Sequence, residues 1–322
     1  MDDLTVILVN YRTEDHTVAC LDHLARLAGE APSQTVVVDN SPSDRLRTDA
    51  GRRGSRVSYL PQTDNVGFAA GVNRGLEAAV GRFVVLLNPD ARPEPGCLSG
   101  LVEVIDGEPM AAAGPALVPM TPGRPCPPSA LRRDPDLWTA LVEYTFWHRI
   151  VGSDWLDRHY FLRAEDVSSS PVDCASVQGA CLALPRTMID RIGGFDDSRF
   201  FLYWEESDFL RRLRVAGGRV LYCPHLRCAH DGGASIEGGG QDPTHFWRGF
   251  YRYHMKHSGR LYELMLRALL ASGITAELTV MAALDVGRRG GDPILRRDLA
   301  TVRVRLREQF RRHPRLESAG AA

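Results

Sequence analysis

Short apolar runs that alternate with helix-like segments define the first third of the chain. Three of the runs are almost entirely apolar, and the fourth, at Val57–Leu60, is short and mixed. Between them, apolar residues recur at helical spacing. Strands that are apolar on both faces and alternate with helices predict an α/β fold, with a mostly parallel central sheet and helices on both faces. We expect strands at Leu4–Val9, Thr35–Val38, Val57–Leu60 and Phe83–Leu87, and helices at Glu14–Leu27 and from Gly67 through Val80.

The pattern weakens in the middle of the chain and becomes helical towards its end. Pro119–Pro135 is rich in proline and is expected to be a long surface loop, and residues 136–173 have no clear period. Leu295, Leu299, Val302, Leu306 and Phe310 then lie on one face of a last, arginine-rich helix. We expect one domain at 1–240 and a helical extension at 241–322. Shorter elements are expected at 180–184 (strand), 186–192 and 207–216 (helices) and 219–223 (strand), and helices from Trp247 onward.

Composition limits the classes of protein that this chain can be. A formal net charge of −1 argues against a general nucleic-acid binder, which would be strongly basic. The seven cysteines are scattered and form no CxxC pair, so we expect neither a zinc site nor disulfides, in keeping with a reducing cytosol. No signal peptide is visible, and the apolar stretches fall short of a bilayer span, so we expect any membrane contact to be peripheral.

Polar residues follow three of the predicted strands. Because ligands bind at the carboxyl ends of strands in such sheets, Asn10, Asp39 and the turn Asn88-Pro89-Asp90 are candidates for a site. Asp39 could accept hydrogen bonds from a nucleobase or ribose, or it could form an Asx turn with Pro42. Asp90 could bind Mg²⁺ or Mn²⁺, or the segment could be only a type I turn.

Three further segments carry candidate chemistry. The glycine-rich stretch Asn65–Gly75 opens a helix and could bind phosphate, or it could serve tight helix–sheet packing. Glu205, Glu206 and Asp208 crowd together in an aromatic setting, which suits a general base, although acids are also favoured at helix starts. His230 could be a metal ligand or a hydrogen-bonded surface residue.

Taken in order, these segments resemble inverting glycosyltransferase family two, which has the GT-A fold, and in particular its rhamnosyltransferase-like branch. The resemblance covers about residues 3–235. It rests on Val6–Tyr11, Val37–Ser41, Asn65–Gly75, Leu86–Asp90, Gly179–Cys181, Gly193–Asp196, Phe200–Asp208 and His230. It implies that the expected domain has a donor half at about 1–118 and an acceptor half at about 174–240.

The resemblance also implies roles for single residues. Asp39 would bind a pyrimidine base, Asp90 and His230 would hold Mg²⁺ or Mn²⁺, and Glu206 would be the base. Two positions depart from the family pattern: Asn88-Pro89-Asp90 replaces Asp-x-Asp, and Glu206 replaces an aspartate, so Glu205 stays an alternative base. The implied catalytic group is Glu206, Glu205 and Asp208, the donor group is Val9, Asn10, Tyr11, Asp39, Asn65, Gly67, Phe68, Asn73, Asn88 and Asp90, and the acceptor group is Gly179, Ala180 and Trp204.

The expected function is therefore transfer of a sugar from a dTDP- or UDP-sugar, with dTDP-L-rhamnose as the leading donor, to a hydroxyl acceptor. The acceptor would be a saccharide, a lipid-linked saccharide or a small natural product. The basic helix near 295–312 suggests peripheral membrane contact, or it packs on the protein with solvated arginines. We expect a cytoplasmic protein, at the inner face of the plasma membrane if that helix binds lipid.

Two other classes of protein are weighed against this one. A nucleotidyltransferase acting on sugar phosphates also uses a parallel sheet and a metal carboxylate, but the first strand here runs into Asn10-Tyr11 without a basic glycine-rich loop. A non-catalytic sugar-nucleotide-binding protein could keep the fold but should have lost its carboxylates, and Asp90, Glu206 and Asp208 are present.

Overall fold

The computed structural model describes residues 3–27, 29–121, 128–163, 167, 169–230, 244–287, 302–303, 306–307 and 309–310. The chain divides into two compact units. Unit 1 contains residues 1–134 and 161–245, and unit 2 contains residues 135–160 and 246–322. The sequence led us to expect a single break near residue 240. The observed division differs in grouping residues 135–160 with the C-terminal helices.

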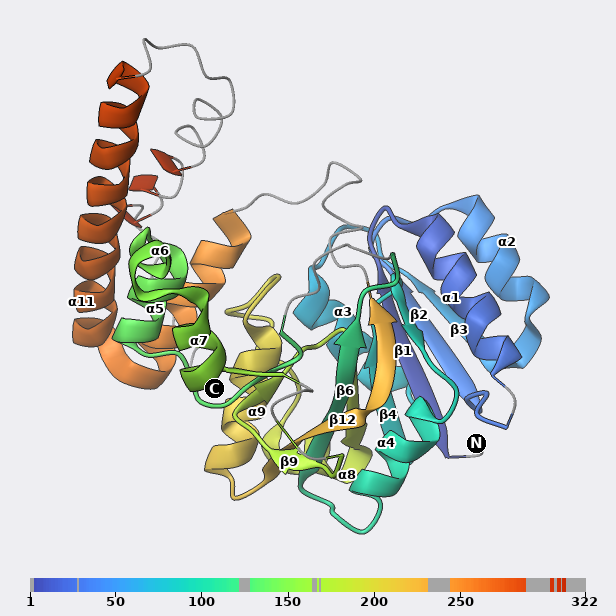
Figure 1. The fold of residues 1–322 in the computed structure, drawn as a ribbon. Coiled ribbons are helices and arrows are strands. Elements are labelled where there is room, and N and C mark those ends of the chain that lie inside the picture. Colours follow the sequence, from blue (N-terminus) through green and yellow to red (C-terminus); the bar gives the residue numbers. More distant parts are fainter. Residues whose placement is uncertain are drawn as a thin grey trace, which may run out of the picture. The chain divides into compact units, whose positions relative to one another are not determined.

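A mixed sheet forms the centre of unit 1 (Figure 1). Its strand order is β3-β2-β1-β4-β11-β6-β12-β5, and β9 pairs with β12. The first four strands in this order are parallel, whereas β11 runs antiparallel to both of its neighbours and β5 antiparallel to β12. The strands are β1 (Leu4–Asn10), β2 (Gln34–Asp39), β3 (Val57–Pro61), β4 (Phe83–Leu87), β5 (Ala91–Pro93), β6 (Ala111–Val118), β9 (Val172–Asp173), β11 (Cys181–Pro185) and β12 (Arg219–His230). A small second sheet joins β10 (Ser176–Val177), β7 (Ala130–Leu131) and β8 (Phe161–Leu162).

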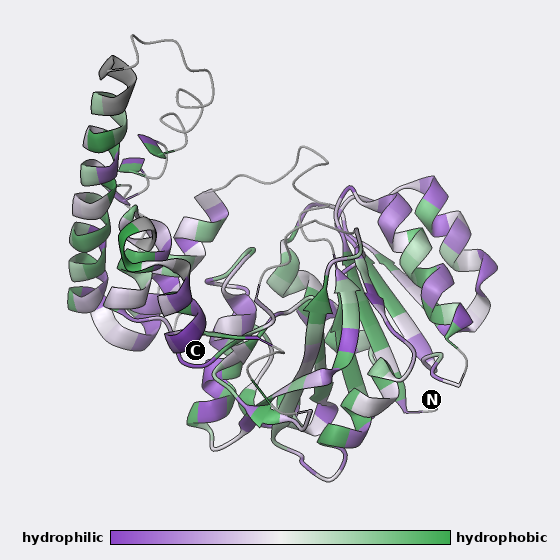
Figure 2. Ribbon diagram, viewed as in Figure 1, coloured by the Kyte–Doolittle hydropathy of each residue, from purple (hydrophilic) through white to green (hydrophobic). Residues whose placement is uncertain are grey.

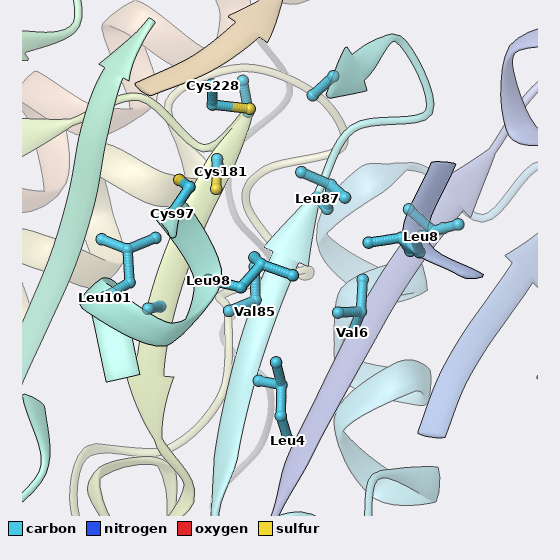
Figure 3. Close-up of a cluster of buried hydrophobic side chains, with 14 of the residues drawn as sticks. Leu4, Val6, Leu8, Val85, Leu87, Cys97, Leu98, Leu101, Cys181 and Cys228 are labelled. Carbon is cyan, nitrogen blue, oxygen red and sulfur yellow. The ribbon is translucent and has the colours of Figure 1, made fainter. Parts of the chain in front are cut away.

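Helices cover both faces of the sheet, as the apolar strands predict. Leu4, Val6 and Leu8 of β1 pack into a cluster with α1 and α4, part of which Figure 3 shows. Ile7 and Val9, which alternate with them, pack into a second cluster with α3, α8 and α9. The helices of unit 1 are α1 (Glu14–Arg26), α2 (Asp44–Arg52), α3 (Phe68–Ala78), α4 (Cys97–Ile105), α8 (Arg186–Ile192) and α9 (Glu205–Val215), with a 3-10 turn at Gly54–Arg56.

The cysteines of the described part of the chain belong to the core. Six of them are buried and free, and Cys126 lies outside the described residues. Cys97, Cys181 and Cys228 sit together in the cluster of Figure 3. Burial raises the pKa of Cys20 to about 12, so this thiol stays protonated and unreactive.

Several elements were missed from the sequence. β5, α4 and β6 were not expected, and β7 lies inside the stretch 119–135 that was expected to be a loop. Alanine-rich β6 carries no strong strand signal, and its burial depends on its neighbours in the sheet. The helix expected at 207–216 begins two residues earlier, at Glu205, and the strand expected at 219–223 continues to His230.

Unit 2 is helical. It holds α5 (Leu137–Tyr144), α6 (Trp147–Val151), α7 (Ser153–His159) and most of α11 (Thr244–Gly287), whose course breaks at Gly259. The expectation that the chain has no segment of membrane-spanning length was wrong. Among the described residues, Thr244–Ala283 is long and apolar enough to span a bilayer by length and composition alone. Most of the arginine-rich helix expected near 295–312 lies outside the described residues.

Candidate active site

Asp39 lies at the carboxyl end of β2, fully buried and held by three neighbours. Its Oδ1 accepts hydrogen bonds from Asn10 Nδ2 over 2.7 Å and from the Ser41 backbone N–H over 3.0 Å. Its Oδ2 accepts one from the Tyr59 hydroxyl over 2.7 Å. The Ser41 contact is the Asx turn that the sequence allowed as an alternative. The turn and the neighbours together fix the carboxylate at the ligand-binding edge of the sheet.

Asn10 connects the ends of β1 and β2. While its Nδ2 donates to Asp39, its Oδ1 accepts from the backbone N–H and the hydroxyl of Thr13 and from the Thr17 hydroxyl. Thr13 and Thr17 were not singled out from the sequence. Tyr11 is half-buried next to Asn10, and the Arg12 guanidinium lies 5.2 Å from its ring centroid. This edge therefore offers a fixed carboxylate beside an accessible aromatic ring.

The glycine-rich stretch serves close packing as well as the start of a helix. A β-carbon on Gly71 or Gly75 would collide with Val9 or Ile7 of β1, so these glycines let α3 approach the sheet. Gly67 has φ +89°, and a β-carbon there would meet the Phe201 backbone. Asn65 Oδ1 accepts from Gly67 N–H, and Phe68 N–H donates to Phe201 O over 2.7 Å. The segment is thereby joined to the Phe200–Asp208 segment.

The turn after β4 reaches β11. The Asn88 N–H donates to Ala180 O over 2.9 Å, and Ala91 N–H donates to Asn88 O, which is the turn that the sequence allowed. A β-carbon on Gly179 would lie 3.5 Å from Glu206 Cβ. Asn88 therefore adjoins Ala180, and Gly179 adjoins Glu206, although these residues come from three segments of the chain.

Asp90 and His230 meet at the same edge. Strand β5 pairs antiparallel with the end of β12, with Ala91 opposite His230. This pairing brings His230 Nε2 to 3.3 Å from Asp90 Oδ1, and both side chains are largely buried. An imidazole nitrogen and a carboxylate oxygen at this distance can bind the same divalent cation. No cluster of three or more such ligands occurs among the described residues, so the protein would supply two ligands.

Glu205 and Glu206 start α9 after a strained backbone. Tyr203 and Trp204 both have positive φ, 67° and 74°, which is uncommon for bulky residues. Because backbone outliers of this kind cluster at functional sites, the strained backbone makes this segment a candidate part of the site. Burial raises the pKa of both carboxyl groups, and the charge of Glu206 raises the pKa of Glu205 further. Oε2 of each is buried with no hydrogen-bond partner in the described structure.

Asp208 and Asn73, which were expected to belong to the site, make contacts that stabilise the fold. Asp208 is fully buried and pairs with Arg212 over 3.0 Å, and Arg212 also donates to the carbonyls of Ile192 and Gly194. The Asn73 amide bonds both backbone groups of Phe195. Both side chains hold the turn after α8 in place. Since Asp208 is used in this ion pair, Glu205 and Glu206 are the better candidates for a base.

Sequence reasoning missed Tyr59. It lies on β3, two residues before the position that pairs with Asp39. Its only signal is an aromatic residue on the strand expected at 57–60, which is common in sheets. A cavity of about 310 Å³ lies elsewhere, lined by Arg82, Phe83, Pro185 and Arg186, at the amino end of β4 and away from these residues.

Comparison with solved structures shows the fold of this chain. The mannosyltransferase PcManGT from Pyrobaculum calidifontis, solved with GDP-Man and Mn²⁺, matches with a TM-score of 0.55 and 19% identity, over 96% of this chain and 84% of that one. The fold is therefore that of the GT-A glycosyltransferases.

Sequence comparison then gives the family. The family model "Glycosyl transferase family 2" matches residues 5–130. An N-acetylglucosaminyl-diphospho-decaprenol L-rhamnosyltransferase of Mycobacterium tuberculosis is 32% identical over 257 residues, which is 76% of this chain and 80% of that protein. The low-salt glycan biosynthesis hexosyltransferase Agl10 of Haloferax volcanii is 25% identical over 72% of this chain and 68% of its own length. The chain belongs to glycosyl transferase family 2, as the sequence resemblance implied.

Proposed function

We propose that this chain transfers L-rhamnose from dTDP-L-rhamnose to a hydroxyl group of a lipid-linked saccharide, with inversion at the anomeric carbon. The observation that carries the transferase chemistry is the meeting of Asp90 with His230, at the edge where the ends of β1 and β2 also lie. The rhamnosyltransferase of M. tuberculosis, whose name includes a diphospho-decaprenol saccharide, supports the choice of sugar and acceptor. A small natural product is the alternative acceptor.

Asp39 would recognise the nucleobase of the donor. It is fixed by Asn10, Ser41 and Tyr59, so it is preorganised to accept a hydrogen bond from a pyrimidine N–H. Tyr11 is accessible enough to contact the base or the ribose. Asn65, Gly67 and Phe68, at the start of α3, would lie along the donor.

Asp90 and His230 fit a divalent cation. Mg²⁺ and Mn²⁺ are commonly held by one or two protein ligands together with substrate phosphates, and this pair provides one carboxylate and one imidazole. When bound, the cation neutralises negative charge on the leaving diphosphate. The Mn²⁺ in the structure of PcManGT supports a cation here, and Mg²⁺ is the alternative.

Glu206 would act as the general base. Its raised pKa makes the carboxylate a stronger base than an ordinary glutamate, which suits removal of a proton from a hydroxyl. The acceptor oxygen would form its bond to the anomeric carbon on one face while the bond to the diphosphate breaks on the opposite face. The proton passes to Glu206. Gly179, Ala180 and Trp204 would border the acceptor.

A donor screen tests this proposal. The full chain is incubated with polyprenyl-diphospho-N-acetylglucosamine, Mn²⁺ or Mg²⁺, and in turn dTDP-rhamnose, UDP-N-acetylglucosamine or GDP-mannose. We expect release of dTDP and a rhamnosylated lipid with the first donor, and none with an Asp90→Ala variant. Faster release from another donor would overturn the choice of rhamnose, and a rhamnosylated soluble glycoside in place of the lipid would overturn the acceptor.

The place of action is also a proposal. A lipid-linked acceptor is confined to a membrane, so we propose that the protein works in the cytoplasm, at the inner face of the plasma membrane. Fractionation of cells that produce the full chain tests this localisation, with recovery in the membrane fraction expected.

A further inference from the structure

The second part of α11, after Gly259, has an inner and an outer face. Leu266, Leu270 and Ile274 are buried, and a β-carbon on Gly273 would collide with Thr145 and Leu141, so this face packs on α5 within unit 2. Eleven residues between Leu261 and Ala283 are exposed on the other side. The outer face is defined here as these eleven residues: Leu261, Leu264, Met265, Ala268, Ser272, Thr275, Ala276, Thr279, Val280, Ala282 and Ala283.

The outer face carries no charged residue, although it is exposed. Leu261 is 73% exposed, and Met265 and Val280 are each 52% exposed. Figure 2 shows hydrophobic turns along this part of the helix. A helix on the surface of a water-soluble unit normally turns its charged residues outward. Here the distribution is reversed, which indicates a non-aqueous neighbour.

The charged residues of the same stretch lie on the other side. Glu263 and Glu277 are buried, and Arg267 pairs with Glu263 and lies 3.7 Å from the centroid of the Tyr251 ring. Arg267 and Glu263 pair with each other inside unit 2, and Glu277 is buried on the same side, so the outer face can leave water without removing a charge from solvent.

The hydroxyl groups of the outer face are satisfied by the helix itself. Ser272 donates to Leu269 O, Thr275 to Ala271 O and Thr279 to Thr275 O, over 2.7 to 2.9 Å. Serine and threonine in lipid-facing helices use the same bonds to backbone carbonyls. The outer face can therefore contact hydrocarbon without leaving a hydroxyl donor unsatisfied.

The segment of the sequence that contains this face is rich in basic residues. Residues 246–322 contain fifteen lysine and arginine residues and seven acidic ones, in a chain whose formal net charge is −1. Arg260, at the start of the stretch, is exposed, as are Arg303, Arg307 and the 73%-exposed Phe310. An excess of arginine in the same segment of the sequence as an uncharged apolar face fits an anionic lipid surface, whereas it would repel a second copy of the same segment.

We propose that the outer face of α11 binds the surface of an anionic phospholipid bilayer, with its leucine and methionine side chains in the boundary between headgroups and acyl chains. This inference deepens the proposed function, because it supplies the surface that would bring the enzyme to a lipid-linked acceptor. The proposed membrane contact is made by α11, whereas the sequence suggested contact through the arginine-rich helix near 295–312. Burial of the apolar side chains and attraction of the basic residues to anionic headgroups would both favour binding.

Vesicle sedimentation of the full chain tests the proposal. We expect the protein to pellet with vesicles of phosphatidylcholine and phosphatidylglycerol, and less with phosphatidylcholine alone. Replacing Leu264 and Met265 together with glutamate should weaken binding at least about tenfold, because two apolar side chains become charged. Val215→Glu is the matched control, since Val215 is 81% exposed on α9 of unit 1, and this variant should bind as the wild type does.

Further measurements separate the outcomes. Thr275→Leu with Thr279→Leu should strengthen binding, which keeps the test valid if the glutamate variant folds poorly. Transfer to a soluble acceptor analogue should be unchanged in the Leu264/Met265 variant, so loss of vesicle binding is distinguishable from failure of the proposed function. The proposal is overturned if the wild type stays in the supernatant with both vesicles. It is also overturned if the wild type is a dimer that the glutamates convert to a monomer without any effect on vesicle binding.

Discussion

The Tyr59 hydroxyl donates a 2.7 Å hydrogen bond to Asp39 Oδ2, so a residue of β3 holds the buried carboxylate at the end of β2. Burial and this hydrogen bond raise the pKa of Tyr59 to about 12, which keeps the phenol protonated and able to donate at all physiological pH values. Tyr59 is therefore a positioning residue for the carboxylate that would recognise the nucleobase.

Replacing Tyr59 with phenylalanine should weaken donor binding. The loss of one hydrogen bond to a carboxylate is expected to raise KM for the donor about tenfold while kcat stays within about twofold. Steady-state kinetics check this, with Ser58→Ala as the control, since adjacent residues of a strand face opposite ways. A fall in kcat at constant KM would contradict the positioning role.

Removing the carboxylate of Asp90 should abolish metal-dependent transfer. We expect Asp90→Ala to lower kcat by at least about 100-fold, because the leaving diphosphate loses its cation. Circular dichroism should show a folded protein, and Mn²⁺ titration should show weakened binding. Asp190→Asn, on the exposed surface of α8, serves as the control. Full activity of Asp90→Ala in the presence of a chelator would refute the metal role.

The two glutamates at the start of α9 should separate by function. Glu206→Gln should bind the donor normally and lose about 10²- to 10⁴-fold in turnover, as expected when a general base is removed. Glu205→Gln, an equally conservative change one residue away, is the matched variant and should keep most of its turnover. If the two results were exchanged, Glu205 would be the base.

The raised pKa of Glu206 should appear in the pH profile of turnover. The base must be deprotonated, so kcat is expected to fall as pH decreases through this raised pKa. The acid limb should therefore lie above the pH of about 4.3 at which an ordinary glutamate titrates. A profile that stays flat down to that pH would rule out Glu206 as the base in its buried state.

Glu143, on α5 of unit 2, should make stability depend on pH. Burial raises its pKa to about 7 in the folded state. The contribution of this group to the free energy of unfolding is fully present below the unfolded pKa of about 4.3. It is lost progressively as pH rises from there through the folded pKa of about 7. Glu143→Gln should therefore stabilise the protein by up to about 3 kcal/mol at pH 8 and not at pH 4. Thermal melts at both pH values check this, and equal shifts at both would contradict it.

The sequence by itself determined the elements whose signals are local. Continuous apolar runs gave β1, β2 and β4, and the helix expected at 186–192 matches α8, which ends before Gly193 with φ 75°. Because parallel strands end at one edge of a sheet, the positions of Asn10, Asp39 and Asp90 could be predicted as a group. The ordered motifs also identified the family from the sequence alone.

Tertiary structure decided the rest. The insertion of β11 antiparallel between β4 and β6, the pairing of β5 with β12, and hence the 3.3 Å approach of His230 to Asp90, depend on contacts between residues far apart in the chain. The hydrogen bond from Tyr59 to Asp39 and the exposure of the outer face of α11 also depend on the tertiary structure. In the sequence alone, the apolar residues of that face look like core residues. Periodicity records which residues share a face of one element. The burial of a side chain, its pKa and its contacts depend on what covers that face, which is known only from the folded chain.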